Sequence, residues 1–573
     1  MILLIFGSGI IFFLFIIILV ASAGFLGDLS ISPYHFYLSL LALLSFILAS
    51  CFLFPFRNRL RVFVLLSGLL ATSFYLSFEV SKSFFDISYD GQAYHQEALF
   101  QLVRGWNPVF HPLRGFESNN MDRALNHYSK GVWFYESVIF KITQNIEAAK
   151  LFHVWLIMAA FSITFSFLLR SKYLPRWLAF LVSLLAAFNP VSIYQSLSFY
   201  LDGQLMSLIV ILITTMGLIY KNRGSNRFNY FLLFMTISIL VNVKLTAGIY
   251  TTIFVVGYLT ILWFTKKNEV LREVFGVSVG AFLLGFIIFG FSPYVTNTLS
   301  QGNPLYPALG TDRSDFTTPQ FPSNFIGRNP EFLLFYSIFA KSDNVRGPDK
   351  AAILKIPFTV SRDELDAFTD TNAKQGGFGP LFGGAILLAF FVFAAALINL
   401  YPLRDRPIRE NAPPDLERSE IDRKTNIRIG LFCSAVVLSS CLINPASSLA
   451  RFIPQMWLFT LFAFFLAYFS KNPLIRILGY AIIITLLLNN ALVGFAYYKY
   501  NCEITGTYHQ QLGKMARESK EKPVHLYFGH FRTSNVWRFE QLGINFEVVE
   551  RKEECKKGQR ILPNSIILQC APD

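Results

Sequence analysis

Runs of apolar residues, each about 20 long, recur from the start of the chain to residue 496 and are separated by polar segments. A run of this length crosses a bilayer as an α-helix. Inside lipid, backbone N–H and C=O groups must form their hydrogen bonds within their own segment, so the runs predict helices and not strands. We therefore expect an all-α polytopic membrane protein with about 13 transmembrane helices. The predicted crossings lie at residues 3–22, 34–55, 61–80, 150–169, 177–189, 205–220, 228–242, 248–265, 273–292, 381–400, 429–443, 452–470 and 474–496.

The composition agrees with this class. Of the 573 residues, 53% are hydrophobic and 15% are charged, whereas soluble domains carry about 25% charged residues. The net charge of +14 is concentrated in alternate loops, of which residues 402–428 are the longest. Loops 21–33 and 189–204 contain no Lys or Arg. This positive-inside pattern places the N-terminus in the cytoplasm and the C-terminus outside, and it argues against a nucleic-acid partner.

Three long polar segments all fall on the non-cytoplasmic side, and this predicts that the protein works there. The C-terminal segment contains VHLYFG, INFEVVE and SIILQC, which read as strands around a short helix and predict a small extracytoplasmic α/β domain. The chain divides into membrane parts 1–80, 150–292 and 381–496 and external parts 81–149, 293–380 and 497–573.

The six cysteines divide into two groups. Three lie in predicted membrane helices and are expected to be packing residues. The other three lie in the external tail, where a disulfide can form. Cys555 and Cys570 flank a segment that can fold back as a hairpin, which predicts a bridge between them and leaves Cys502 unpaired.

The first external segment begins with SYDGQAYHQEALFQLVRGWNPVF. Asp90 can cap a helix on whose polar face Tyr94, Glu97 and Gln101 follow, with leucines opposite. The pattern predicts an amphipathic helix at the membrane surface. Carboxylates at such a place are costly and often functional.

Isolated basic residues provide a second candidate group. Lys244 and Arg451 lie at external membrane ends, against the positive-inside trend, and Lys130 lies in the first external segment. Such cations can bind an anionic phosphate. The alternative interpretation is that they extend to the interface without a specific ligand. Asp202, at the start of a crossing, either positions substrate or caps its helix.

The histidines do not predict a metal site. His95, His111 and His127 are widely spaced and no cysteine accompanies them.

YDGQAYHQEALFQLVRGWNPVFHPL resembles the first outer loop of the GT-C glycosyltransferases, which include the protein O-mannosyltransferases and the lipid A aminoarabinose transferases. In that family an acidic residue follows a crossing, a Tyr-containing helix comes next and a G-x-x-x-P turn closes it. The corresponding features here are Asp90, Tyr94 and GWNP, in which two residues and not three separate Gly105 from Pro108. GNPLYP, which contains Tyr306, is similar to a second segment of the family.

The resemblance implies an enzyme that transfers a sugar from a polyprenyl phosphate to a hydroxyl group of a lipid, glycan or protein. Asp90 would be the general base of an inverting displacement. The expected substrate-binding residues are Tyr94, His95, Glu97, Lys130, Asp202, Lys244, Tyr306 and Arg451.

Many members of the family have two adjacent acidic residues, whereas this chain has Asp90 followed by Gly91. Asp86 and Glu97 are the candidates for a second carboxylate. The sequence predicts no particular cofactor, and the use of a divalent cation is left open.

Three other functions stay open. Arginines in the two large loops fit an O-antigen-type polymerase or ligase. The remaining alternatives are a lipid or sugar transporter and a non-enzymatic assembly protein. The expected location is a bacterial inner membrane with the active site on the periplasmic face, and an endoplasmic reticulum membrane would give the same topology.

Overall fold

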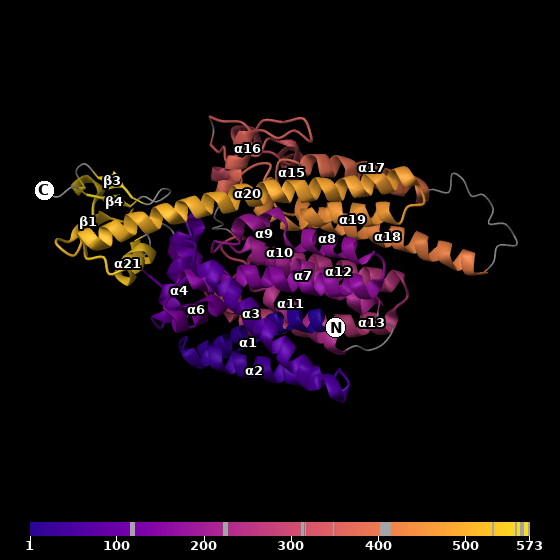
Figure 1. The fold of residues 1–573 in the computed structure, drawn as a ribbon, viewed down its shortest axis with the longest axis horizontal. Helices are drawn as coiled ribbons and strands as arrows, with labels where there is room; N and C mark the ends of the chain where they lie inside the picture. The colour runs from indigo at the N-terminus through magenta and orange to yellow at the C-terminus, as the bar shows by residue number, and fades with distance from the viewer. Residues whose placement is uncertain are drawn as a thin grey trace.

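A computed structural model shows a chain that is mostly helical, at 72%, with a small sheet near its C-terminus (Figure 1). The structure describes residues 1–573 except 115–120, 222–226, 311–314, 316, 348, 401–413, 530–531, 556–557, 562–566 and 571–573.

Within the described ranges, nine helices are long and apolar enough to span a membrane. They belong to α1 (Ile2–Leu26), α2 (Pro33–Cys51), α3 (Arg59–Lys82), α7 (Leu151–Ser171), α10 (Asp202–Lys221), α12 (Leu245–Phe264), α13 (Asn268–Leu283), α18 (Pro414–Leu442) and α20 (Pro473–Glu518). Each coincides with a predicted crossing.

The other four predicted crossings coincide with shorter apolar helices. These are α8 (Arg176–Ala187), α11 (Arg227–Leu240), α17 (Phe382–Leu400) and α19 (Trp457–Tyr468). The nine longer helices are of the kind that forms an integral membrane protein.

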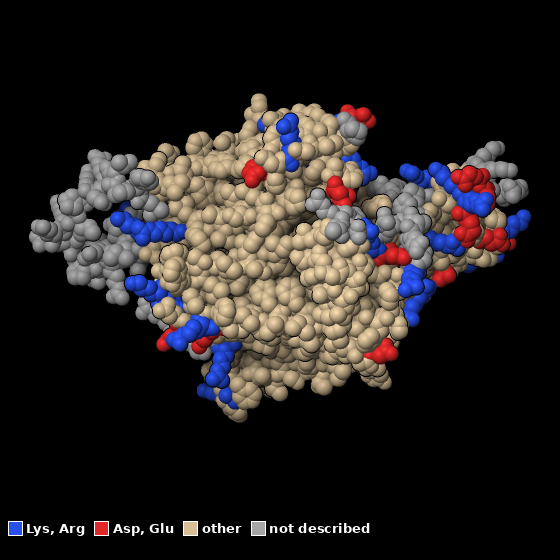
Figure 2. Space-filling view, turned by 180° about the vertical axis from the view of Figure 1, so that it is seen from behind, with Lys and Arg blue, Asp and Glu red and all other residues tan. Residues whose placement is uncertain are grey.

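The surface agrees with a membrane-embedded body. Figure 2 shows a broad middle region with few charged side chains, while Lys, Arg, Asp and Glu gather toward both ends of the long axis. Exposed apolar residues such as Leu41, Leu65 and Trp263 lie on the outer helices α2, α3 and α12. Surfaces of this kind face lipid.

The centre of the bundle is formed by α1, α7 and α10, whose residues are mostly buried within the protein. Close packing of α1 against α7 needs a small residue, since a Cβ at Gly7 would lie 2.6 Å from Ile163 Cγ1. Small residues let helix backbones approach in this way.

Residues 81–149 and 293–380, which the sequence predicts to be external, contain short helices. They are α4 (Gln96–Val103), α5 (Met121–His127), α6 (Gly131–Thr143), α14 (Thr296–Gln301), α15 (Pro330–Phe339) and α16 (Arg362–Asp366), and α9 (Pro190–Gln195) precedes α10. The predicted amphipathic surface helix is α4. That interpretation was wrong: Gln96, Glu97 and Leu99 are all buried, because other segments of the protein cover both faces of the helix.

The C-terminal part begins as a continuation of α20, whose 46 residues extend for about 70 Å at 1.5 Å per residue. A helix this long exceeds the thickness of a bilayer core, and its far end carries the small sheet (Figure 1). The strands β1 (Val524–Tyr527), β2 (Phe546–Val548), β3 (Gln559–Arg560) and β4 (Leu568–Gln569) pair in the order β2-β1-β4-β3, with α21 (Arg532–Gln541) after β1. The predicted C-terminal α/β unit is therefore present.

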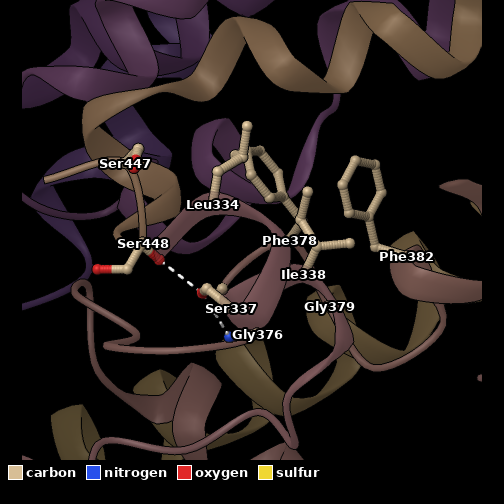
Figure 3. A pocket seen from close by; sticks show the side chains of 10 residues that line it. Leu334, Ser337, Ile338, Gly376, Phe378, Gly379, Phe382, Ser447 and Ser448 are labelled. Carbon is tan, nitrogen blue, oxygen red and sulfur yellow. Dashed lines mark hydrogen bonds between the residues drawn. The ribbon is translucent and has the colours of Figure 1, made fainter. Parts of the chain in front are cut away.

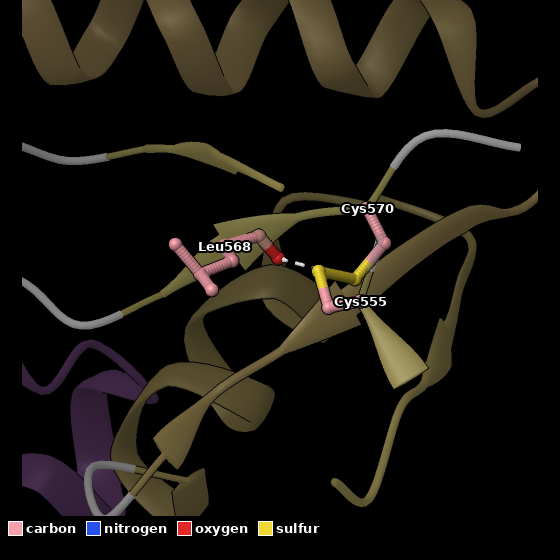
Figure 4. Close-up of a disulfide and its surroundings, with 3 residues drawn as sticks. All are labelled: Cys555, Leu568 and Cys570. Carbon is pink, nitrogen blue, oxygen red and sulfur yellow. Dashed lines mark hydrogen bonds between the residues drawn. A yellow bond between two sulfur atoms is a disulfide. The ribbon is translucent and has the colours of Figure 1, made fainter. Parts of the chain in front are cut away.

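The predicted disulfide is also confirmed. Cys555 and Cys570 are bonded (Figure 4), and the hairpin of β3 and β4 brings them together. Cys502 is a free, exposed thiol on the extension of α20.

Candidate functional site

Four charged side chains from distant parts of the chain meet at the ends of the membrane helices. Arg451 Nη1 lies 3.1 Å from Asp90 Oδ2 and 3.8 Å from Asp202 Oδ2. Lys244 Nζ lies 2.8 Å from Asp202 Oδ1. We name Asp90, Asp202, Lys244 and Arg451 the ion cluster. The sequence singled out all four, and the structure brings them together.

Each member of the ion cluster lies at the edge of a helical element. Asp202 is the first residue of α10 and Lys244 immediately precedes α12. Arg451 lies in a short 3₁₀ turn, Ala450–Phe452, after α18. Asp90 immediately precedes a π-helical turn, Gly91–His95, that leads into α4. The prediction that Asp90 caps this helix was wrong, because its side chain makes no capping hydrogen bond and pairs with Arg451 instead.

Aromatic rings hold the two cations in place. The guanidinium carbon of Arg451 lies 4.9 Å from the ring centre of Tyr200 and 4.5 Å from that of Phe452. Lys244 Nζ lies 4.2 Å from the Phe452 ring. Cations are attracted to ring faces at such distances, more strongly where water is excluded. Tyr200 and Phe452 were not among the predicted residues.

The ion cluster is partly open. The Asp202 and Arg451 side chains are 2% and 7% exposed, whereas Asp90 and Lys244 are 21% and 27% exposed. Buried charges of this kind are costly even when paired, so their presence favours a functional role. Among the described residues Arg451 Nε has no hydrogen-bond partner, which leaves a donor for an anion.

Tyr94 and His95 lie next to the ion cluster. Trp133 Nε1 donates to His95 Nδ1 over 2.8 Å, and the Tyr94 and His95 rings are 4.2 Å apart. The pKa of His95 is lowered to about 3, mainly by burial; Asp202 opposes this shift, and the charges of Lys244 and Arg451 add to it. His95 is therefore a neutral ring that accepts from Trp133.

Three other predicted site residues make their contacts elsewhere. Glu97 Oε1 accepts from Gln101 Nε2 over 2.7 Å. Lys130 is buried and donates to two backbone carbonyls, those of residues 126 and 128, each over 2.9 Å. The Tyr306 ring packs on His127 at 4.8 Å. These contacts are those expected of groups that fix the fold of the external part.

Lys374, which was not among the predicted residues, lies close enough to the ion cluster for Arg451 and Asp90 to affect its pKa. It is 5% exposed, and its Nζ donates to Gln320 Oε1 over 2.7 Å. Burial and then the charge of Arg451 lower the pKa of Lys374 to about 7, while Asp370 and Asp90 act in the opposite direction. The one sequence signal for it is an isolated lysine two residues before a glycine-rich run.

Gln195 joins this second external part to the ion cluster. Its Nε2 lies 3.2 Å from both Asp202 Oδ2 and the carbonyl oxygen of Thr371, and its Oε1 accepts from Gly203 N over 2.9 Å. The loop that contains Lys374 is thereby tied to the first turn of α10.

Asp86, a candidate for a second carboxylate, is buried beside the ion cluster. It accepts from the backbone N–H groups of Ser88, over 2.8 Å, and Phe199, over 3.1 Å. Burial raises the pKa of Asp86 to about 6, opposed by Lys150 and assisted by Glu147. The Asp86 carboxylate therefore holds the backbone at Ser88 and Phe199, and its hydrogen bonds do not include Arg451.

A small cavity of about 10 Å³ lies next to these loops (Figure 3). It is lined in part by Ser337, Ser448 and Gly376, and Ser337 Oγ donates to the carbonyl oxygen of Ser448 over 2.6 Å. This volume holds about one water molecule. Three chain segments line it: α15, the run from Gly376 to Phe382 that follows Lys374, and Ser447 and Ser448, which precede Arg451.

In the part of the chain that the structure describes, no group of three or more His, Cys, Asp and Glu side chains is arranged to hold a metal ion. The two carboxylates of the ion cluster already pair with Arg451 and Lys244.

Comparison with models of protein families, with curated proteins and with solved structures finds no match to this chain. The fold and the site define the class, a helical membrane protein with a partly open ion cluster at its helix ends.

Proposed function

We propose that the chain is an integral membrane glycosyltransferase of the GT-C type. It transfers a sugar from a polyprenyl phosphate to a hydroxyl group of a lipid, glycan or protein on the extracytoplasmic face of the membrane. The bacterial inner membrane is the proposed location. The observation that carries this proposal is the ion cluster, in which a partly exposed carboxylate lies beside two cations at the ends of membrane helices.

The cations suit a lipid phosphate. Arg451 has a free Nε donor and a planar guanidinium that can hold two phosphate oxygens. Lys244, which pairs with Asp202, and Lys374, whose pKa is lowered by burial and by Arg451, add positive charge near it. A phosphate that enters the site competes with Asp90 for Arg451, and this exchange releases the Asp90 carboxylate for chemistry.

In the proposed step the acceptor oxygen attacks the anomeric carbon of the sugar. The bond between that carbon and the phosphate oxygen breaks, and its electron pair stays on the phosphate. The acceptor proton passes to the Asp90 carboxylate. Arg451, Lys244 and Lys374 stabilise the charge on the leaving phosphate, and Asp202 holds Arg451 and Lys244 in place.

One observation favours the second candidate, a polymerase or ligase that uses a lipid diphosphate. Arg346 is one of the loop arginines that this alternative predicts, and its charge contributes to lowering the pKa of Lys374. A further cation at the rim of the site suits a second phosphate group. Donors with one and with two phosphate groups therefore both belong in the assay.

The test is transfer of labelled sugar by the purified protein in lipid nanodiscs, with polyprenyl-phosphate and polyprenyl-diphosphate donors. Asp90→Asn removes the proton acceptor and is expected to lower kcat about 10²- to 10⁴-fold with donor binding retained. Asp363→Asn is the matched control, because Asp363 forms an exposed ion pair with Lys341, which is not a member of the ion cluster. Equal turnover by Asp90→Asn and the wild type would exclude Asp90 as the base.

A further inference from the structure

The C-terminal unit, which we define as residues 497–573, is connected to the segment that leads to Asp90. Phe85 lies in the hydrophobic core of this unit together with Tyr508, Leu512 and Leu526. Its ring centre is 5.5 Å from that of Tyr508. The chain between α3 and Asp90 is therefore held by a unit that begins more than 400 residues later in the sequence.

A buried ion pair makes a second connection. Arg538, on α21, places Nη2 2.5 Å from Glu147 Oε1, and the two side chains are 5% and 7% exposed. The guanidinium carbon of Arg538 also lies 5.2 Å from the Phe85 ring. Removal of Glu147 would leave the buried Arg538 without its carboxylate, which is strongly unfavourable. Removal of Arg538 would leave the buried Glu147 with Lys150 as its remaining charged partner.

Glu147, the partner of Arg538, is also hydrogen-bonded to Asp86. Its Oε2 accepts from Asp86 N over 3.0 Å and pairs with Lys150. The carboxylate of Asp86 in turn accepts from Ser88 N and Phe199 N. Hydrogen bonds thus run from the C-terminal unit to the backbone on each side of the ion cluster.

Both ends of this chain of contacts reach the site. Ser88 lies two residues before Asp90. Phe199 precedes Tyr200, whose ring centre is 4.9 Å from the Arg451 guanidinium. A shift of Asp86 would therefore move the carboxylate and the aromatic support of its partner together.

We propose that the C-terminal unit sets the geometry of the ion cluster, with Arg538 as a positioning residue that acts through Glu147 and Asp86. The structural part stands on these contacts alone. The effect on turnover rests on the proposed function.

The structural part is tested by hydrogen exchange of the full chain in nanodiscs. Arg538→Met keeps the length of the side chain and removes its charge. We expect exchange at the amides of Asp86, Ser88 and Phe199 to accelerate at least tenfold. Arg532→Met is the matched control, since Arg532 lies on the same helix in an exposed ion pair with Glu550, and it should leave these amides unchanged.

A second variant covers the case in which Arg538→Met does not fold. Phe85→Leu loosens the contact with the C-terminal unit and keeps an apolar side chain, and the same amides should exchange faster. Unchanged exchange at these amides in whichever of the two variants folds would overturn the proposal. Failure of both variants to fold, with Arg532→Met folded, would also overturn it, because the unit would then maintain the whole fold and not this segment.

Measurement of kcat and KM distinguishes a role of Arg538 in positioning the ion cluster from a role in the stability of the whole protein. With an active donor, Arg538→Met should lower kcat about tenfold with KM for the donor within twofold, and Arg538→Lys should recover part of the loss. Faster exchange without any sugar transfer by the wild type would contradict the proposed function and leave the structural inference standing. Normal kcat together with faster exchange would contradict the role of Arg538 in the site.

Discussion

Gly91 is a residue whose lack of a side chain shapes the surroundings of Asp90. A Cβ at this position would lie 1.9 Å from Asp86 Oδ2 and 2.3 Å from Ser88 Oγ. Both atoms belong to the buried turn that leads into the ion cluster. Glycine is thus required here for space.

Replacement of Gly91 by alanine should destabilise the protein by about 1–3 kcal/mol, because the added methyl group displaces Asp86 from its backbone donors. The measurement is chemical unfolding of the purified protein. Gly513→Ala is the control, since nothing lies within 4 Å of its added Cβ on α20, and a helical Gly→Ala change can stabilise by up to about 1 kcal/mol. Equal stability of Gly91→Ala and the wild type would show that this packing is looser than described.

His95 predicts a dependence of stability on pH. Burial lowers its pKa from 6.5 to about 3, so between these values the unfolded chain binds a proton that the folded protein does not. Stability from this group is complete above pH 6.5 and is lost as the pH falls toward 3, by up to about 1.4 kcal/mol per pH unit.

The His95→Asn variant should therefore lose less stability than the wild type between pH 6.5 and pH 5, as measured by the unfolding midpoint. His111→Asn, at an exposed histidine, should follow the wild type. Parallel pH profiles for His95→Asn and the wild type would contradict a neutral, buried His95.

At the scale of elements, the long apolar runs predicted the membrane helices well, whereas the amphipathic pattern predicted the position of α4 poorly. The membrane runs are long and uniform, so each predicts a helix independently of its neighbours. The surface position expected for α4 was wrong because Trp537 of the C-terminal unit packs on its Phe100, with ring centres 5.4 Å apart. A contact between segments so distant leaves no local pattern.

The length of α20 was missed for a related reason. Its apolar run ends near residue 496, but Ile504, Tyr508, Leu512 and Met515 continue at helical spacing and pack in the C-terminal core. This spacing indicates a helix only once the C-terminal core that covers these residues is known. A single helix therefore joins the membrane part to the C-terminal unit.

The extension of α20 also allows a test of sidedness. Cys502 is exposed, whereas Cys51 and Cys441 are buried. A membrane-impermeant maleimide should label intact cells or spheroplasts from outside, and Cys502→Ser should abolish most of that labelling. Labelling of Cys502 only after the membrane is opened would place the C-terminal unit in the cytoplasm and contradict the proposed topology.

At the scale of the whole molecule, the ion cluster depends on a fold that joins distant residues. Asp90 and Arg451 are 361 positions apart. The sequence identified Asp202, Lys244 and Arg451 because a charge at a membrane end is conspicuous in an apolar chain. Lys374 lies inside a long polar segment, where a lysine is ordinary, and only the structure places it near the others.

The whole-molecule arrangement also explains why several predicted residues do not reach the ion cluster. Lys130 was selected as an isolated charge, but it donates to a backbone carbonyl. Tyr306 was selected from the GNPLYP segment, but its ring packs on His127. Sequence alone cannot separate a cation that binds a ligand from one that binds carbonyl groups, since both are isolated lysines.

The most direct test of the account is an experimental map of the protein bound to a non-hydrolysable polyprenyl-phosphate sugar. We predict that the phosphate lies within hydrogen-bonding distance of Arg451, in place of the Asp90 carboxylate, and that the anomeric carbon faces Asp90. A lipid phosphate bound away from Arg451, with the Asp90–Arg451 pair intact, would contradict the proposed site and the enzymatic role built on it.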